Sequence, residues 1–156
     1  MIKYIELKWP IATKTRRLMF FGLIAALFLG GCDKDNGINN NNPYIPIVNF
    51  SYTINLSLPL YTNLQYASNH VIINYPSVGY LGVVVFNNGN GYVAYELACP
   101  NQSIASCSQM TISGVSAVCA CDNASYNLFS GQAQGKKYPL KQYRTQLVNG
   151  NLTIYN

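Results

Sequence analysis

Cysteine is the residue type in this sequence whose number and spacing could do chemistry. The chain contains five cysteines, and four of them gather in one stretch. These four are Cys99, Cys107, Cys119 and Cys121. Thiols clustered in this way form either a metal site or a set of disulfide bonds, and the spacing alone does not decide between them. The fifth cysteine, Cys32, lies apart from the others in the sequence and needs a separate interpretation.

Cys32 follows a segment with the features of a secretion signal. A basic N-terminal region leads into an apolar stretch, residues 18–29, which is too short to cross a bilayer as a helix. The stretch ends in Leu-Gly-Gly at positions 29–31, and an aliphatic residue and two small residues before a cysteine fit a lipobox. We expect residues 1–31 to be a signal peptide and Cys32 to be acylated. The alternative is an uncleaved signal anchor.

The residues after Cys32 are predicted to form a tether. Residues 32–43 are rich in Asn, end at a proline and cannot bury apolar surface. We therefore expect a signal peptide, a flexible tether over residues 32–43 and a domain over residues 44–156. Such a chain is a membrane-anchored lipoprotein of the bacterial cell envelope, expected at the outer membrane on its periplasmic or surface face. Its expected partners are the lipid bilayer and an unidentified envelope protein.

Removal of the signal changes the charge of the protein. The whole chain has ten basic and five acidic residues, but only five basic and four acidic residues lie after position 31. This nearly neutral balance gives no electrostatic support for nucleic-acid binding. Four of the five remaining cations fall between Lys136 and Arg144. We interpret them as a solvated strand edge that is guarded by charge.

Few residues of the domain could perform acid–base catalysis. Glu96 and Asp122 are its only acidic residues, and His70 is the one histidine of the chain. No Ser-His-Asp arrangement can be assembled around His70, because no acid or nucleophile signature lies near it. We interpret His70 as a partly exposed residue at a strand edge and Glu96 as a solvent-facing strand residue. We expect no enzyme, or at most an electron-transfer component of an oxidoreductase system.

The elements that position the cysteines are predicted to be β-strands. Apolar residues alternate with polar or smaller ones from Val48 to Leu56, and later runs are rich in β-branched and aromatic residues. The predicted strands cover residues 48–56, 71–75, 80–86, 92–98, 140–148 and 152–155, with hairpin turns at 87–91 and 149–150. We expect an all-β fold, an antiparallel sandwich or barrel with an inserted cysteine-bearing lobe between about Cys99 and Tyr126.

Two loops of this lobe resemble the ligand loops of the Rieske iron–sulfur family. In that family an antiparallel β structure carries two cluster-binding loops of the form C-x-H and C-x-C-H or C-x-x-H. The first loop here is Cys-Pro-Asn at positions 99–101, directly after a predicted strand, and the second is Cys-Ala-Cys-Asp at positions 119–122. The resemblance spans roughly residues 58–156. It implies the cluster-site positions Cys99, Asn101, Cys119, Asp122 and Tyr126.

The chain departs from this family at the ligands. A Rieske cluster is held by two thiolates and two imidazoles. Asn101 and Asp122 stand where the histidines should be, and the whole chain has one histidine. The serine that the family carries in the second loop is replaced by Ala124, whereas the loop tyrosine is kept as Tyr126. Two imidazole ligands from one chain are therefore impossible.

Two hypotheses follow for the lobe. In the first, the domain has lost its cluster, binds no cofactor and serves as a disulfide-stapled binding or structural module. The resemblance then implies the pairs Cys99–Cys119 and Cys107–Cys121. In the second, altered ligands still hold a metal. Cys99, Cys119 and Asp122 with another cysteine, or four thiolates, could bind a 2Fe–2S cluster for electron transfer or a zinc ion.

Overall fold

The regular structure of the described residues consists almost entirely of β-strands. The computed structural model describes residues 41–156, and the predicted signal peptide and Cys32 lie outside the described residues. All strand pairs in the described part are antiparallel, which confirms the expected all-β class. The elements in chain order are β1 (Ser51–Asn55), the 3-10 helix η1 (Pro59–Gln65), β2 (His70–Ile73), β3 (Val83–Asn87), β4 (Tyr92–Glu96), β5 (Thr111–Ser113), β6 (Ser116–Val118), β7 (Ser125–Asn127), β8 (Gln142–Val148) and β9 (Asn151–Tyr155).

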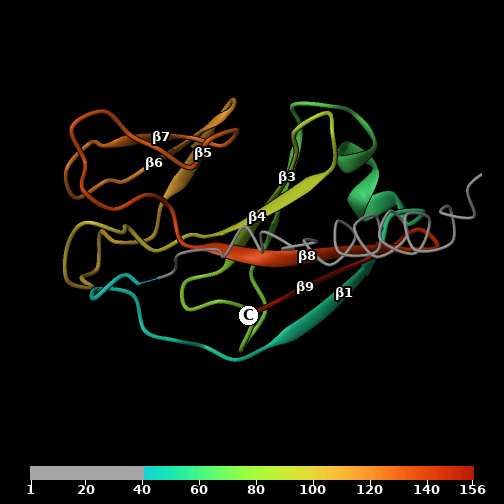
Figure 1. The fold of residues 1–156 in the computed structure, drawn as a ribbon, viewed down its shortest axis with the longest axis horizontal. Helices are drawn as coiled ribbons and strands as arrows, with labels where there is room; N and C mark the ends of the chain where they lie inside the picture. The colour runs from blue at the N-terminus through green and yellow to red at the C-terminus, as the bar shows by residue number, and fades with distance from the viewer. Residues whose placement is uncertain (1–40) are drawn as a thin grey trace, which may run out of the picture. The chain divides into compact units, whose positions relative to one another are not determined.

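Six of the strands form the main sheet. Its strand order is β1-β9-β8-β4-β3-β2, so that the first and last strands of the described chain are neighbours. Figure 1 shows β1, β9 and β8 side by side along one part of the sheet. The β8–β9 hairpin turns at Asn149 and Gly150, which have φ angles of 48° and 77°. Both values lie in the left-handed region that a two-residue hairpin needs and that Asn and Gly tolerate. This predicted hairpin is confirmed.

The β3–β4 hairpin separates two hydrophobic clusters. Val83 and Val85 belong to one cluster, together with residues of β1, β9 and η1. Val84 and Phe86 belong to the other, together with residues of β6, β7 and the cysteine-bearing segment. Successive side chains of a strand point to opposite faces, so the hairpin is covered on both. This explains why the sequence around β3 is a continuous apolar run.

A second, smaller sheet lies in the segment between β4 and β8. We call this segment, residues 97–141, the cysteine lobe. It contains a three-stranded sheet with the order β5-β6-β7, which Figure 1 shows set apart from the main sheet. One isolated bridge between Ala98 and Gln109 continues the end of β4 into the lobe. The predicted insertion is therefore present, but it extends beyond Tyr126 to the start of β8.

Two sequence-based expectations about the sheet need correction. The cations between Lys136 and Arg144 are interpreted above as a solvated strand edge guarded by charge, but β8 lies inside the sheet between β9 and β4. Lys141, at its start, is 3% exposed. β8 is paired with β4 through Gln142 and Tyr143 and with β9 from Arg144 to Val148, so the strand joins two parts of the sheet and does not form its outer edge. The short strands β5 to β7 and the 3-10 helix had no predicted counterpart.

No helix among the described residues is long and apolar enough to cross a membrane.

Candidate functional site in the cysteine lobe

The four cysteines of the lobe form two disulfide bonds. Cys99 is bonded to Cys119, with 5.6 Å between their Cα atoms, and Cys107 is bonded to Cys121, with 5.1 Å between theirs. These are the pairs that the family resemblance implies. The bridges span sequence separations of 20 and 14 residues. Bridges that close loops of this size stabilise a domain by roughly 3 kcal/mol each.

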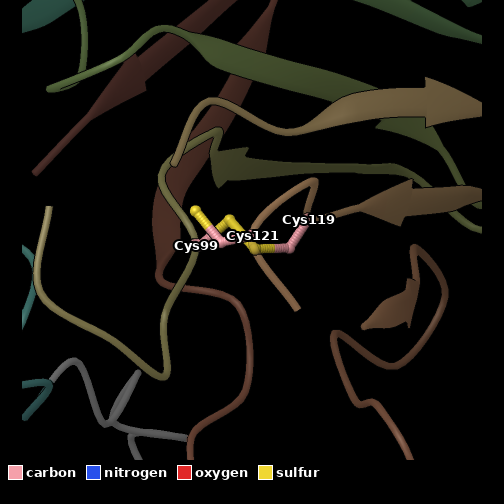
Figure 2. Close-up of side chains that lie close together, drawn as sticks. All are labelled: Cys99, Cys119 and Cys121. Carbon is pink, nitrogen blue, oxygen red and sulfur yellow. A yellow bond between two sulfur atoms is a disulfide. The ribbon is translucent and has the colours of Figure 1, made fainter. Parts of the chain in front are cut away.

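Main-chain hydrogen bonds hold the two cysteine loops in place. Cys99 lies shortly after the end of β4 at Glu96, and its N–H donates to the carbonyl oxygen of Ser108 at 2.8 Å. Cys119 follows β6, and its N–H donates to the carbonyl oxygen of Ala124 at 2.9 Å. The two bonds turn each loop back on itself. The sulfur atoms of both loops therefore meet inside the lobe, as Figure 2 shows.

Asn101 joins the first loop to two other parts of the lobe. Its amide nitrogen donates to Tyr126 Oη at 2.9 Å and to the carbonyl oxygen of Tyr138 at 2.7 Å. Its amide oxygen accepts from the N–H of Tyr138 at 2.9 Å. The ring of Tyr126 is fully buried, and this burial raises the pKa of its phenol. Asn101 therefore acts as a polar link in the position where the family would have a histidine ligand.

Asp122 forms an ion pair across the lobe. Its carboxylate accepts from Lys136 Nζ at 2.6 Å and from the N–H of Ala124 at 3.1 Å. Burial acts to raise the pKa of the carboxyl, but the hydrogen bonds from Lys136 and Ala124 outweigh burial, so that the pKa is lowered. Its contribution to stability is therefore present at neutral pH and lost as the pH falls through that lowered value. Asp122 stands at the second position that the resemblance assigns to a histidine ligand, and its carboxylate oxygens already have hydrogen-bond partners.

The N-terminal part of the described chain lies against the first cysteine loop. Asn42 Nδ2 donates to the carbonyl oxygen of Pro100 at 2.7 Å. The ring of Tyr44 meets the ring of Tyr138 edge-on, with 5.9 Å between centroids. Asn42 was predicted to belong to the tether, and in the structure it contacts the lobe.

The burial of Glu96 differs from the prediction made from the sequence. We expected a solvent-facing residue, but its side chain is fully buried at the end of β4. Its carboxylate accepts four hydrogen bonds: Tyr143 Oη at 2.6 Å, and the N–H groups of Tyr80 at 2.7 Å, Leu81 at 2.8 Å and Ala98 at 3.1 Å. Strand alternation places Glu96 on a definite face of β4, but both faces of this strand are covered. No solvent-facing side was therefore available.

Tyr143, Lys141 and Gly79 complete the surroundings of Glu96. Burial and the nearby carboxylate raise the pKa of Tyr143, so that its hydroxyl stays protonated and donates. Burial lowers the pKa of Lys141, and attraction to Glu96 partly offsets this effect. Lys141 Nζ donates to the carbonyl oxygen of Pro46 at 3.0 Å. Gly79 must be a glycine, because its φ is 71° and a Cβ atom would lie 2.9 Å from Glu96 Oε2.

The residues of the lobe do not fit a Rieske cluster. The two thiolate positions, Cys99 and Cys119, are bonded to each other. The two histidine positions hold Asn101 and Asp122, whose side chains already have partners. His70, the chain's one histidine, begins β2 of the main sheet outside the lobe, and burial lowers its pKa.

Comparison with solved structures finds Rieske-type and ferredoxin-type domains among the matches. A complex of oxygenase and ferredoxin of carbazole 1,9a-dioxygenase aligns at 16% identity and a TM-score of 0.44, over 69% of this chain and 93% of the other. The plasma-membrane Rieske protein of the cyanobacterium Synechocystis aligns at 20% identity and a TM-score of 0.43, over 56% and 86%.

A nitrite reductase small subunit from Mycobacterium tuberculosis, described as putative, aligns at 12% identity and a TM-score of 0.42, over 70% of this chain and 97% of the other. No protein-family profile and no curated protein matches the sequence. TM-scores below 0.5 do not by themselves assign a fold family. The all-β class therefore rests on the strands described above.

We predict that Glu96→Gln destabilises the protein by about 2–3 kcal/mol, because an amide NH₂ would face N–H and O–H donors in a buried site. Urea unfolding followed by circular dichroism measures the change. Asp122→Asn is the matched control, since it makes the same chemical change at a partly exposed carboxylate and should cost clearly less. Equal unfolding midpoints for the two variants would contradict the role of Glu96.

We also predict that Asn101→Ala costs about 1–3 kcal/mol, because it removes three hydrogen bonds and leaves the groups of Tyr138 without their partner. Thermal unfolding in oxidising buffer tests this expectation. Asn90→Ala makes the same change in an exposed hairpin turn and should leave the midpoint within a degree or so of the parent's. If both variants behave alike, Asn101 is not a link between the loops.

Proposed function

We propose that this chain is a membrane-anchored envelope lipoprotein whose Rieske-like domain has lost its cluster. The domain then serves as a disulfide-stapled binding or structural module, without a cofactor. The observation that carries this proposal is that all four cysteines of the domain are paired with each other. A pair of thiolates that is closed into a disulfide offers no ligand to iron.

The surroundings of the two former ligand positions support this interpretation. Asn101 and Asp122 are the residues at which a metal-binding site would need free donors. Both instead hold polar partners from distant parts of the lobe, Tyr138 in one case and Lys136 in the other. Hydrogen bonds from these polar side chains to other parts of the lobe stabilise the domain without a metal.

The proposed location rests on the sequence around Cys32. The lipobox predicts acylation of this cysteine, and export brings the domain to an oxidising compartment in which disulfides persist. The described chain begins near Pro100, since Asn42 is bonded to its carbonyl oxygen.

The intact mass of the exported protein tests the proposal. We would express the full chain in a bacterium that processes lipoproteins and extract it in detergent without reductant. The expected protein begins at a diacylated Cys32 and is lighter than its reduced form by the four hydrogens of two disulfides. Cys32→Ser is the matched control and should keep residues 1–31. Removal of residues 1–31 from that variant would contradict lipoprotein processing.

A second candidate function is metal binding by the same cysteines. The Sγ atoms of Cys99, Cys119 and Cys121 all lie within 4.8 Å of one another. After reduction, thiolates at this spacing suit zinc or a 2Fe–2S cluster with thiolate ligands, and the cluster would give an electron-transfer protein. In the same mass measurement, this function would add the mass of zinc or of an iron–sulfur unit, released by acid. That outcome would overturn the proposal that the domain is a module without a cofactor.

A further inference from the structure

The two disulfides differ in their exposure to solvent. Cys99 is 1% exposed and Cys119 is 0% exposed, so that the inner bridge is shielded. Cys107 is an exposed residue and Cys121 is partly buried, so that the outer bridge has one of its two cysteines at the surface. Exchange with a thiol requires access to a disulfide sulfur. A dithiol in solution can therefore attack the outer bridge at Cys107, whereas the inner bridge is closed to it.

The sulfur atoms of the two bridges are nevertheless close to each other. Cys121 Sγ lies within 4.8 Å of the Sγ atoms of both Cys99 and Cys119. Figure 2 shows the sulfur of Cys121 beside the inner bridge. A thiolate formed at Cys121 would thus stand next to a disulfide in the same folded domain. Reactions between groups held together in this way proceed at high effective concentration.

Ser108 is placed to stabilise a thiolate at Cys121. Its side chain is fully buried, and its Oγ lies 3.9 Å from Cys121 Sγ. The same oxygen accepts a hydrogen bond from the N–H of Ala105 at 2.9 Å. Because the oxygen is the acceptor there, its own hydrogen is free to point at the sulfur. A hydrogen bond to a charged group favours the charged form.

We propose that the two bridges form a thiol–disulfide relay, in which the outer bridge takes two electrons from a dithiol and Cys121 passes them to the inner bridge. This activity is independent of the lipid anchor and of any metal. It gives the domain a redox function that the stapled module lacks.

The relay balances in two stages. A thiolate of the dithiol attacks Cys107 Sγ, the outer S–S bond breaks, and Cys121 leaves as a thiolate beside Ser108. The second thiol of the dithiol then attacks the mixed disulfide and releases Cys107 as a thiolate. The dithiol has lost two electrons and become a disulfide, and the outer cysteine pair has gained those electrons.

In the second stage, the Cys121 thiolate attacks one sulfur of the inner bridge. The S–S bond between Cys99 and Cys119 breaks, and the displaced cysteine takes up a proton. The Cys107 thiolate then attacks Cys121 Sγ in the new bond and releases the other inner cysteine, which is also protonated. The outer bridge is restored, and the inner bridge has been reduced to two thiols.

Two variants of the full chain, each with one lobe cysteine replaced, test the relay. Both carry Cys32→Ser as well, so that only thiols of the lobe react. Cys107→Ser leaves Cys121 as a free thiol beside the inner bridge. Cys121→Ser is the matched control, because it removes the same outer bridge but leaves the free thiol on Cys107. Each oxidised variant is incubated at alkaline pH and alkylated, and the labelled cysteines are located by peptide mass spectrometry.

The relay predicts label on Cys99 or Cys119 in the Cys107→Ser variant, in roughly tenfold excess over the Cys121→Ser variant. Label confined to Cys121 in the first variant would overturn the relay. Equal spreading of label in both variants would also overturn it, because exchange would then reflect loss of the bridge and not the position of the thiol.

A third variant tests the role of Ser108. Adding Ser108→Ala to the Cys107→Ser variant should move the exchange to higher pH, because the thiolate loses its hydrogen bond. A merely structural role of Ser108 would change the extent of folding but not the pH dependence of the exchange rate. An unchanged pH profile would contradict the assignment of Ser108.

Discussion

The buried side chain of Glu96 joins several parts of this domain. An ionised group can leave water only where hydrogen bonds replace its hydration, and Glu96 has four. Its donors come from the loop before β3, from the start of the cysteine lobe and from β8. Lys141 is buried beside it and extends to the carbonyl oxygen of Pro46. The Glu96 side chain therefore ties β4 to the loop before β3, to the lobe and to β8, and Lys141 links the residues before β1 to this site.

The cysteine lobe is stabilised differently from the main sheet. Its strands have only three residues each, which is too few to stabilise a sheet by themselves. Besides its part of the second hydrophobic cluster, the lobe has covalent bridges, the ion pair of Asp122 and the links made by Asn101. Polar and covalent contacts thus cross the middle of the lobe and join its loops.

Much of the main sheet could be predicted from local sequence, because alternation and Asn-Gly turns act between near neighbours. The hairpin at Asn149 and Gly150 is of this kind. Glu96 was misjudged, because alternation gives the face of a strand but not what covers that face. Asn101 could be recognised as a replaced ligand, but its partner Tyr138 is 37 positions away and no local pattern signals it. The strands β5 to β7 are too short to show a period.

The pairing of β1 with β9 has a consequence for how the chain folds during synthesis. Ser51 is paired with Tyr155 and Asn55 with Asn151, so that β1 has no sheet partner until residues 151–155 are available. A polypeptide that is synthesised from its N-terminus carries β1 without its strand partner until residues 151–155 have been made. Open edges invite pairing with other chains. Aggregation is therefore avoided when the nascent chain is kept apart from other chains until β9 can pair with β1.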